Sequence, residues 1–545
     1  MKRLAELYNP KIKDSVVAQP ETNRMHLLGE GSHMPPIFAI LAVILAAAIP
    51  RLMLIGGLPA TDEGVFAYFA QIVHASLSAG RGLPDTGPLM LYPLLLNWVF
   101  AFDANPLIAL RLIDMLIAVA AGYALFLVIE VESGSRPGAI LISLVFVFTM
   151  NQPVFIQYGF KNSMFAAYVP LFTALWLGLT APVGAFARRW IAIGALLSIA
   201  VLLRETFLPL IVVGALAVLI QRGFRSFFQV AVGGIVTGLL ILGLLIAARG
   251  GIASLLESYQ GVAKIYAAMA AKRTELFFSS GAQFMQEANV TLVVAGVGFI
   301  VALVRSLGKS SVTSLPKLGF WLAATLVPLI EPASKIGFPY HFSVCLPGLA
   351  GLAALGWRNV CDGSRQALLS HRTCGALSIV VLSILIPRAV GLWSNWPESR
   401  EVLASFQTRQ WPETFTDKSN YLMAAEVIRQ ATPSGGTVAV SGYMYALYPL
   451  SGLTPPKPEL ANLTNVIIDL DLSEPRLRET LLRCPPDVVM TTTRTDWPGS
   501  SEILAAVRNT NIYEEIAEVP TTDNRHYGSF GGLIFRSIRR FPCEK

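Results

Sequence analysis

The sequence has little charge for its length. Only 14% of its 545 residues are Asp, Glu, Lys or Arg, and 54% are hydrophobic, whereas soluble domains carry roughly 25% charged residues. The mean hydropathy is +0.56, which indicates that much of the surface faces lipid. The net charge of +7 does not point to nucleic acid, because the Lys and Arg lie in short loops between apolar runs, as the positive-inside rule predicts.

Cysteine is scarce too. Five residues exclude a disulfide-rich scaffold, and no CxxC pair indicates zinc. Cys484 and Cys543 both fall in the C-terminal region, where they would pair in an extracytoplasmic compartment and otherwise be two free thiols. No P-loop or G-x-G-x-x-G occurs, so no nucleotide is expected. Residues 1–35 are mixed polar, without a signal peptide, and the first apolar run starts only near Pro36.

What the sequence has in abundance is apolar runs, and about 20 apolar residues cross a bilayer. The pair Arg204-Glu205 separates two of these runs. A charge at the bilayer centre costs about 2.5–3.5 kcal/mol, so this pair predicts a turn near an interface. We expect eleven spans, at 36–55, 106–130, 138–152, 163–181, 190–203, 206–221, 227–248, 289–305, 317–331, 340–357 and 374–393.

The loop charges predict an orientation. If the N-terminal segment 1–35 is cytoplasmic, every inner loop is basic, and the eleven crossings place residues 394–545 outside. This predicts a multi-pass inner (plasma) membrane protein with a transmembrane domain over 36–393 and an extracytoplasmic C-terminal domain. The basic residues of the inner loops are Arg136, Arg188, Arg189, Arg222, Arg225, Arg305, Lys309, Lys317, Arg358, Arg365 and Arg372.

Two outer loops, about 56–105 and 250–288, are long. In the first, residues 61–79 have a helical apolar pattern and 89–102 form an apolar stretch too short to span, so both predict helices along the interface. The second loop predicts one more amphipathic helix.

The C-terminal region differs in composition. Buried strands are expected at 437–441, 487–492 and 532–535, with helices at 417–431, 473–483 and 501–509. Strands alternating with helices predict a small α/β domain.

Polar side chains gather on the predicted outer side, where ionisable residues near a membrane usually mark function. Carboxylates there would act as a general base or bind a divalent metal, and Arg or Lys would hold a phosphate. A lipid-phosphate substrate needs both. The residues are Asp62, Glu63, Asp85, Arg111, Lys161, Asn162, Arg204, Glu205, Lys272, Arg273, Lys335, Tyr340 and His341.

Each of these residues also has a structural explanation. Asp62 and Glu63 could be first-turn acids of the helix that follows, and Arg111 an interfacial side chain that reaches water. Arg204-Glu205 could be an ion pair at a helical hairpin. Among the others, His341 could be a satisfied interfacial histidine, and Lys272 and Arg273 could contact anionic headgroups.

Four segments, taken in order, resemble the GT-C glycosyltransferases of the protein-mannosyltransferase type, including the aminoarabinose transferase that acts on lipid A. The segments are Ala60-Thr-Asp-Glu-Gly-Val-Phe-Ala-Tyr68, Leu83-Pro-Asp-Thr-Gly-Pro-Leu-Met-Leu-Tyr92, Arg111-Leu-Ile and Tyr340-His-Phe-Ser-Val-Cys-Leu-Pro347. The resemblance covers most of residues 36–545. Each motif is short, so the specificity of the resemblance comes from the order and spacing of the motifs within the topology.

The resemblance implies roles for individual residues. Asp62 matches the acid that acts as catalytic base or positions the acceptor, and Glu63, its neighbour in the motif, is expected to be catalytic as well. Asp85 matches a second loop acid that holds a metal in some members, with Glu63 as a further candidate ligand. Arg204 stands near the expected lipid phosphate, together with Lys161, Lys272, Arg273 and Arg111. The expected substrate contacts are Asp85, Tyr92, Tyr340 and His341.

The chain also departs from the family. Many members have a Lys after the second acid, where this chain has Thr86-Gly87-Pro88, and some have an Asp where it has Asn162. The first departure removes a phosphate contact and the second weakens the case for a divalent metal ion. The WWDYG signature of oligosaccharyltransferases is absent, which argues against en bloc transfer to asparagine.

These observations predict an inverting glycosyltransferase. Its donor would be a polyprenyl-phosphate sugar, its acceptor a lipid, glycan or protein, and its surroundings membrane lipids, with no organic cofactor. The alternatives are a polysaccharide polymerase or ligase of similar fold, a secondary transporter, and a membrane scaffold that binds partners through 394–545. A transporter should show inverted repeats, and a scaffold would tolerate loss of Asp62.

Overall fold

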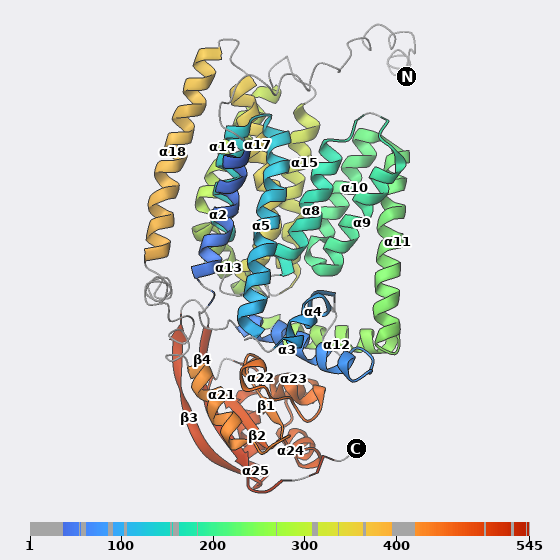
Figure 1. Ribbon diagram of the computed structural model, residues 1–545, viewed down its shortest axis with the longest axis vertical. Helices are drawn as coiled ribbons and strands as arrows, with labels where there is room; N and C mark the ends of the chain where they lie inside the picture. Colours follow the sequence, from blue (N-terminus) through green and yellow to red (C-terminus); the bar gives the residue numbers. More distant parts are fainter. Residues whose placement is uncertain are drawn as a thin grey trace.

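The structure is a computed structural model in which a tall bundle of helices stands on a smaller α/β domain (Figure 1). It describes residues 36–53, 55, 61–84, 91–102, 106–152, 155, 163–182, 184–268, 270–307, 314–335, 337–362, 367–394, 420–494, 497–524, 528–540 and 542–543.

Each of the eleven apolar runs forms a helix, as the sequence predicts. Their ends agree within a few residues for most runs, because charged, Pro or Gly residues flank the apolar stretches. The helices are α2 (Pro36–Met53), α5 (Pro106–Ser133), α6 (Arg136–Met150), α8 (Ser163–Leu179), α9 (Ala187–Leu203), α10 (Leu208–Arg222), α11 (Phe224–Ala248), α14 (Asn289–Leu307), α15 (Ser314–Leu326), α17 (Leu346–Asp362) and α18 (Ala367–Ser394).

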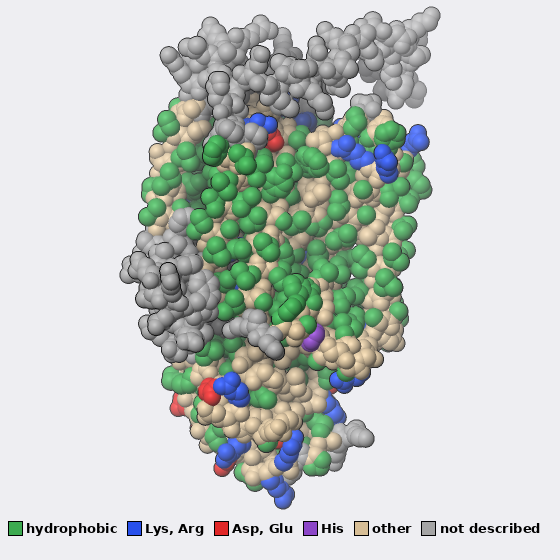
Figure 2. Space-filling view, viewed as in Figure 1, with side chains coloured by type: hydrophobic (Ala, Val, Ile, Leu, Met, Phe, Trp, Pro, Cys, Tyr) green, Lys and Arg blue, Asp and Glu red, His purple; other side chains and the backbone are tan. Residues whose placement is uncertain are grey.

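Four segments of the described chain are long and apolar enough to cross a membrane: α5, Glu205–Arg222, α11 and α14. Several other bundle helices are apolar but shorter. Figure 2 shows hydrophobic side chains over the visible face of the bundle, with Lys and Arg gathered near its upper end and on the α/β domain. This distribution fits a membrane protein, and the number of eleven crossings stays a prediction.

Helices from the two long loops lie across the lower end of the bundle. The first loop forms α3 (Thr61–Ser78), α4 (Leu91–Leu96) and the 3-10 helix η5 (Asn97–Ala101). Figure 1 shows α3, α4 and α12 between the bundle and the α/β domain.

The prediction of a single amphipathic helix over 250–288 is wrong. The chain forms α12 (Ile252–Ala268), η8 (Ala270–Lys272) and α13 (Arg273–Glu287). The physical reason is that the two halves pack on different partners. On α12, Lys264 pairs with Asp469 of the α/β domain at 3.3 Å, whereas α13 stacks Phe284 on Phe342 of the bundle at 5.7 Å between ring centroids.

Short 3-10 turns interrupt the lower ends of the bundle helices. The predicted turn at Arg204-Glu205 is present: α9 ends at Leu203, Arg204 is extended with φ −155°, and η7 covers Glu205–Phe207. The chain after α15 forms η9 (Val327–Leu329), α16 (Ile330–Ser334) and η10 (Pro339–Cys345). The expected span 340–357 therefore begins as 3-10 helix and becomes α-helix only at Leu346, because Pro339 and Pro347 have no N–H to donate.

The C-terminal region is the predicted small α/β domain. Its sheet has the order β1-β2-β4-β3, with β1 and β2 parallel and the other neighbours antiparallel. The strands are β1 (Val438–Val440), β2 (Val488–Thr492), β3 (Tyr513–Asn524) and β4 (Gly528–Ser537), and the helices are α21 (Asn420–Ala431), α22 (Leu447–Ser451), η11 (Pro458–Ala461), α23 (Leu463–Asp469), α24 (Glu474–Arg483) and α25 (Ser500–Asn509).

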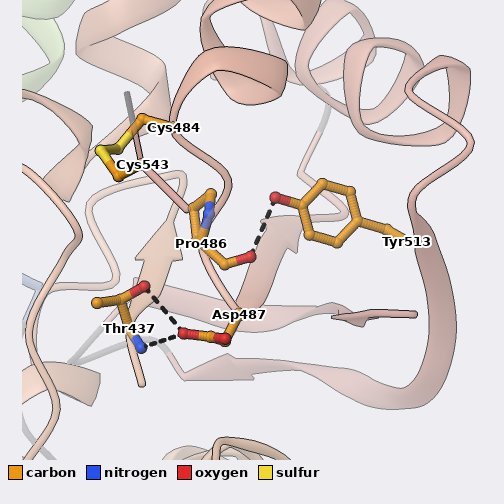
Figure 3. Close-up of a disulfide and its surroundings, with 6 residues drawn as sticks. All are labelled: Thr437, Cys484, Pro486, Asp487, Tyr513 and Cys543. Atoms are coloured by element: carbon orange, nitrogen blue, oxygen red, sulfur yellow. Dashed lines mark hydrogen bonds between the residues drawn. A yellow bond between two sulfur atoms is a disulfide. The ribbon is translucent and has the colours of Figure 1, made fainter. Parts of the chain in front are cut away.

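The structure joins Cys484 and Cys543 in a disulfide, the pairing that the sequence left open (Figure 3). Nearby, Asp487 accepts a hydrogen bond from the backbone N–H of Thr437 at 2.8 Å, which ties the start of β1 to the start of β2. The Tyr513 hydroxyl donates to the carbonyl of Pro486 at 3.1 Å and fixes the start of β3. The disulfide therefore holds the segment at Cys543 beside the point where these hydrogen bonds fix the starts of three strands.

Candidate functional site

A buried arginine stands where α9 breaks. Arg204 caps α9 and is only 8% exposed. Its guanidinium Nη2 lies 3.4 Å from His341 Nε2, and its centre lies 5.6 Å from the centroid of the Tyr340 ring. Arg204 immediately precedes η7 and His341 lies in η10, which leads into α17, so these two breaks between helices bring together residues 137 positions apart.

A second cation continues this cluster. Lys335 Nζ lies 3.1 Å from Glu205 Oε1 and 3.2 Å from Glu331 Oε1. Glu331 in turn lies 3.6 Å from His341 Nδ1. Burial opposes the charge of Lys335, but Glu205 and Glu331 outweigh it and raise the pKa of Lys335 above its ordinary value. The cluster therefore holds two permanent cations against two carboxylates around one imidazole.

Some buried polar atoms of this cluster have no hydrogen-bond partner in the described part of the chain. Arg204 Nε and Glu205 Oε2 are among them. A buried N–H without a partner costs roughly 1–3 kcal/mol, so Arg204 Nε is a donor that a further acceptor would satisfy.

Helix α12 brings an aromatic hydroxyl to the same cluster. Burial raises the pKa of Tyr266, while the positive charges of Lys335 and Arg204 lower it. Tyr266 is therefore within electrostatic reach of both cations. The Arg204 cluster, as we name it, consists of Arg204, Glu205, Tyr266, Glu331, Lys335, Tyr340 and His341.

The acidic motif at the start of α3 lies in a different arrangement. Glu63 is 1% exposed, and both of its oxygens accept from Arg111, at 2.6 Å from Nε and 2.8 Å from Nη2. Arg111 also donates to the carbonyl of Ile55 at 2.9 Å. The predicted phosphate ligand Arg111 thus binds a carboxylate of its own chain. Asp62 lies in the first turn of α3.

Sequence reasoning missed a second buried pair one turn further along α5. Arg51 of α2 donates to Asp114, and both side chains are at most 6% exposed. The Arg51 guanidinium lies 4.3 Å from the centroid of the Phe165 ring. The signal was present in the sequence, because an Arg and an Asp inside apolar runs are expensive unless they pair.

The other predicted site residues are scattered. Tyr92 is buried in the core, with its ring 5.6 Å from that of Phe66. Lys272 is exposed at the junction before α13. Arg273 is half-buried one turn before Phe277, whose ring lies 5.4 Å from that of Phe342, the residue after His341. Asp85, Lys161 and Asn162 lie outside the described residues.

The described residues do not fit the expected divalent metal. Glu63 already uses both carboxylate oxygens on Arg111, and Asp85, the other expected ligand, is not among these residues. Within the described ranges, no group of three His, Cys, Asp or Glu side chains could hold an ion.

The α/β domain contacts the start of α3 directly. A Cβ added at Gly64 would lie 2.3 Å from the backbone nitrogen of Ala446, so only glycine permits this approach. One turn later, the Tyr68 ring lies 5.2 Å from that of Tyr445 and 4.5 Å from that of Tyr448. The domain is thus placed beside the acidic motif.

Comparisons with known proteins give distant structural matches alone. No protein-family model and no curated protein matches the chain. The fold is similar to the crystal structure of an Archaeoglobus fulgidus oligosaccharyltransferase in complex with zinc and sulfate, with a TM-score of 0.47, 13% identity and coverage of 90% of this chain and 72% of that chain. A match at this level carries no argument about function.

Proposed function

We propose that the protein is an integral membrane glycosyltransferase. Its donor is a sugar linked to a polyprenyl phosphate, its acceptor is a lipid, glycan or protein, and transfer takes place on the outer face of the membrane. The observation that carries this proposal is the Arg204 cluster, in which two cations, the buried Arg204 and the half-buried Lys335, lie at the end of an apolar bundle and beside the α/β domain.

The cluster suits a lipid phosphate for electrostatic reasons. The donor is a phosphodiester with one negative charge, and the carrier that leaves is a phosphate monoester with up to two. Cations fixed in place before the reaction stabilise the charge that develops, which is usually the largest catalytic contribution. Arg204 has a buried N–H to offer, and Lys335 lies on the far side of Glu331 from His341.

The residue proposed as base is Asp62, at the first turn of α3. It would accept the proton of the acceptor hydroxyl or amine while that group bonds to the anomeric carbon. The bond from the anomeric carbon to the phosphate oxygen breaks at the same time, so the transfer inverts the configuration. Glu63 is assigned a positioning role, because its pair with Arg111 fixes the start of α3 against α5.

The disulfide supports the proposed orientation. Such bonds persist in oxidising compartments outside the cytosol, and Cys484–Cys543 lies in the α/β domain. Arg188, Arg189, Arg222 and Arg225 flank the ends of α9, α10 and α11 opposite to Arg204, as expected of a cytoplasmic side.

The first test is lipid mass spectrometry on wild type, Asp62→Asn and Arg204→Ala purified from native membranes. We expect a polyprenyl-phosphate sugar or its spent carrier on wild type, build-up of the sugar-loaded form on Asp62→Asn, and loss of both from Arg204→Ala. Arg188→Ala, at the opposite end of the bundle, should match wild type. If all four proteins carry only bulk phospholipid, the proposed donor is wrong; if the sugar lipid ignores both site changes, the site is wrong.

A further inference from the structure

Two aromatic side chains stand at the carboxyl edge of the parallel strands of the α/β domain. Tyr443 follows β1, and Trp497 follows β2, its direct neighbour. Their rings are 5.0 Å apart between centroids with 34° between the planes. Both residues are only half-buried. In open α/β sheets, ligands bind outside the carboxyl ends of the strands, so this edge is the place to expect a ligand.

Tyr443 has a backbone conformation that its side chain disfavours. Its φ is +62°, in the left-handed region, which is uncommon for a bulky residue. The loop before it is held on both sides: Ser441 Oγ accepts from Thr492 N at 2.8 Å, and Gly442 N donates to Thr464 Oγ1 at 2.8 Å. Strain that the surroundings enforce is concentrated at binding sites, and here its effect is to hold the ring in place.

Polar groups frame the two rings. The Tyr443 hydroxyl donates to Asn465 Oδ1 on α23 at 3.1 Å. The Arg494 guanidinium lies 5.4 Å from the centroid of the Trp497 ring. An apolar ring face with hydrogen-bonding groups at its rim is the pattern that suits a sugar, which has apolar C–H faces and hydroxyls around its edge.

Aromatic contacts connect the pair to α3: the Tyr443 ring centroid lies 6.1 Å from that of Tyr445, which lies 5.2 Å from that of Tyr68 on α3. Burial raises the pKa of Tyr443, and Tyr445 and Tyr266 raise it further, which places Tyr443 within electrostatic reach of the Arg204 cluster's tyrosine. On the other side, the pKa of Tyr421 is raised by burial, lowered by Arg494 and raised by Glu63. Arg494, whose guanidinium lies over the Trp497 ring, is therefore within electrostatic reach of Tyr421. Tyr421 is in turn within electrostatic reach of Glu63, at the start of α3.

We propose that Tyr443 and Trp497 form a sugar subsite, contributed by the α/β domain, that binds the pyranose ring of the lipid-linked donor. This inference rests on the proposed function and extends it. The donor sugar must lie between the phosphate held at the Arg204 cluster and the base on α3, because its anomeric carbon is bonded to the phosphate and is attacked by the acceptor. The bundle alone would then bind the carrier phosphate but would not discriminate its sugar.

The experiment measures how much the sugar adds to affinity. Full-length protein in nanodiscs is titrated with two probes, farnesyl phosphate and farnesyl phosphate β-glucose, with the mannose epimer as a further probe. On wild type, the better sugar probe should bind about tenfold more tightly than farnesyl phosphate, which corresponds to roughly 1.4 kcal/mol. Trp497→Ala and Tyr443→Asn should remove that difference and leave the affinity for farnesyl phosphate unchanged.

The variants are chosen to separate ring loss from unfolding. Asn tolerates the left-handed conformation, so Tyr443→Asn removes the ring without adding strain. Tyr443→Phe and Trp497→Phe keep a stacking face and should retain most of the difference. Tyr513→Phe removes a tyrosine hydroxyl elsewhere in the same domain and should behave as wild type.

The outcomes separate this inference from the function on which it rests. If neither probe binds wild type, the proposed donor class fails. If both probes bind and the sugar's advantage survives in Trp497→Ala and Tyr443→Asn, the proposed function stands and the aromatic subsite is wrong. The subsite is equally wrong if these variants weaken farnesyl phosphate as much as the sugar probe, because the rings would then only pack the domain against the bundle.

Discussion

Charged side chains inside the bundle occur in pairs drawn from different helices. Glu63 of α3 holds Arg111 of α5, and Lys317 Nζ lies 3.2 Å from Glu132, which is 1% exposed. A buried pair adds little net stability over apolar residues, but loss of one partner leaves an uncompensated charge. These pairs therefore fix which helices meet, and we assign their members positioning roles rather than catalytic ones.

This reasoning predicts that Glu63→Gln destabilises the protein. Removal of the carboxylate takes away the charge that both pairs with and hydrogen-bonds to the mostly buried Arg111 guanidinium, which should cost about 3 kcal/mol, the lower end for a buried pair because Arg111 remains 13% exposed. Thermal unfolding in detergent would measure it. The matched control is Glu130→Gln, whose pair with Arg136 is 27% and 38% exposed and should contribute less than about 1 kcal/mol. An unchanged unfolding temperature in Glu63→Gln, together with abolished transfer, would instead make Glu63 catalytic.

At the residue scale, the sequence predicted which residues belong to the candidate site better than it predicted which of them are in contact. Arg204, Lys335 and His341 could be singled out because ionisable residues are costly in apolar runs. Their meeting could not be predicted, since it depends on where η7 and η10 break the helices. The partner of Arg111 was hidden for the same reason. The pair Arg51 and Asp114 was visible in principle, but each alone reads as a residue near the end of a span.

At the scale of elements, the apolar runs predicted the bundle helices and the alternation of buried strands predicted β1 and β2. The sequence did not reveal β3, because Tyr513–Asn524 carries Glu514, Glu515 and Glu518 and no continuous apolar run. It lies at the edge of the sheet, paired only with β4, where charged residues are expected. Strand β3 is stabilised by its long pairing with β4, which depends on the folded structure and not on a local sequence pattern.

The disulfide gives a prediction at the same scale. Cys484 and Cys543 are 59 residues apart, and closing a loop of that length stabilises a fold by about 4 kcal/mol in the chain-entropy account. Reduction of wild type should therefore lower the unfolding temperature of the α/β domain and leave the bundle's transition in place. The double variant Cys484→Ser/Cys543→Ser should start at the lowered value and ignore reductant. A reductant effect of equal size in the double variant would show that another thiol is responsible.

At the scale of the whole molecule, the proposed chemistry requires the Arg204 cluster and the α/β domain to share the outer face. Figure 1 places α3 and α12 between the bundle and this domain, so one face of the membrane must hold all of them. The basic residues after α10 belong to the opposite end. The side of the membrane that holds the α/β domain therefore decides three things together: whether the donor can reach the cluster from the outer leaflet, whether the disulfide can form, and whether the basic ends face the cytoplasm.

We predict that single cysteines report this orientation. In a background with Cys361→Ser and Cys374→Ser, the exposed positions Ser501 on α25 and Gln221 at the end of α10 are each replaced by Cys. A membrane-impermeant maleimide should label Ser501→Cys in right-side-out vesicles at once, because that position faces the external solution. It should label Gln221→Cys only after detergent opens the vesicles. The background without either new cysteine is the blank, since Cys345 is buried and Cys484 and Cys543 are bonded. The reverse pattern would place the Arg204 cluster on the cytoplasmic side and exclude a donor taken from the outer leaflet, whereas immediate labelling at both positions would mean an even number of crossings between α10 and α25.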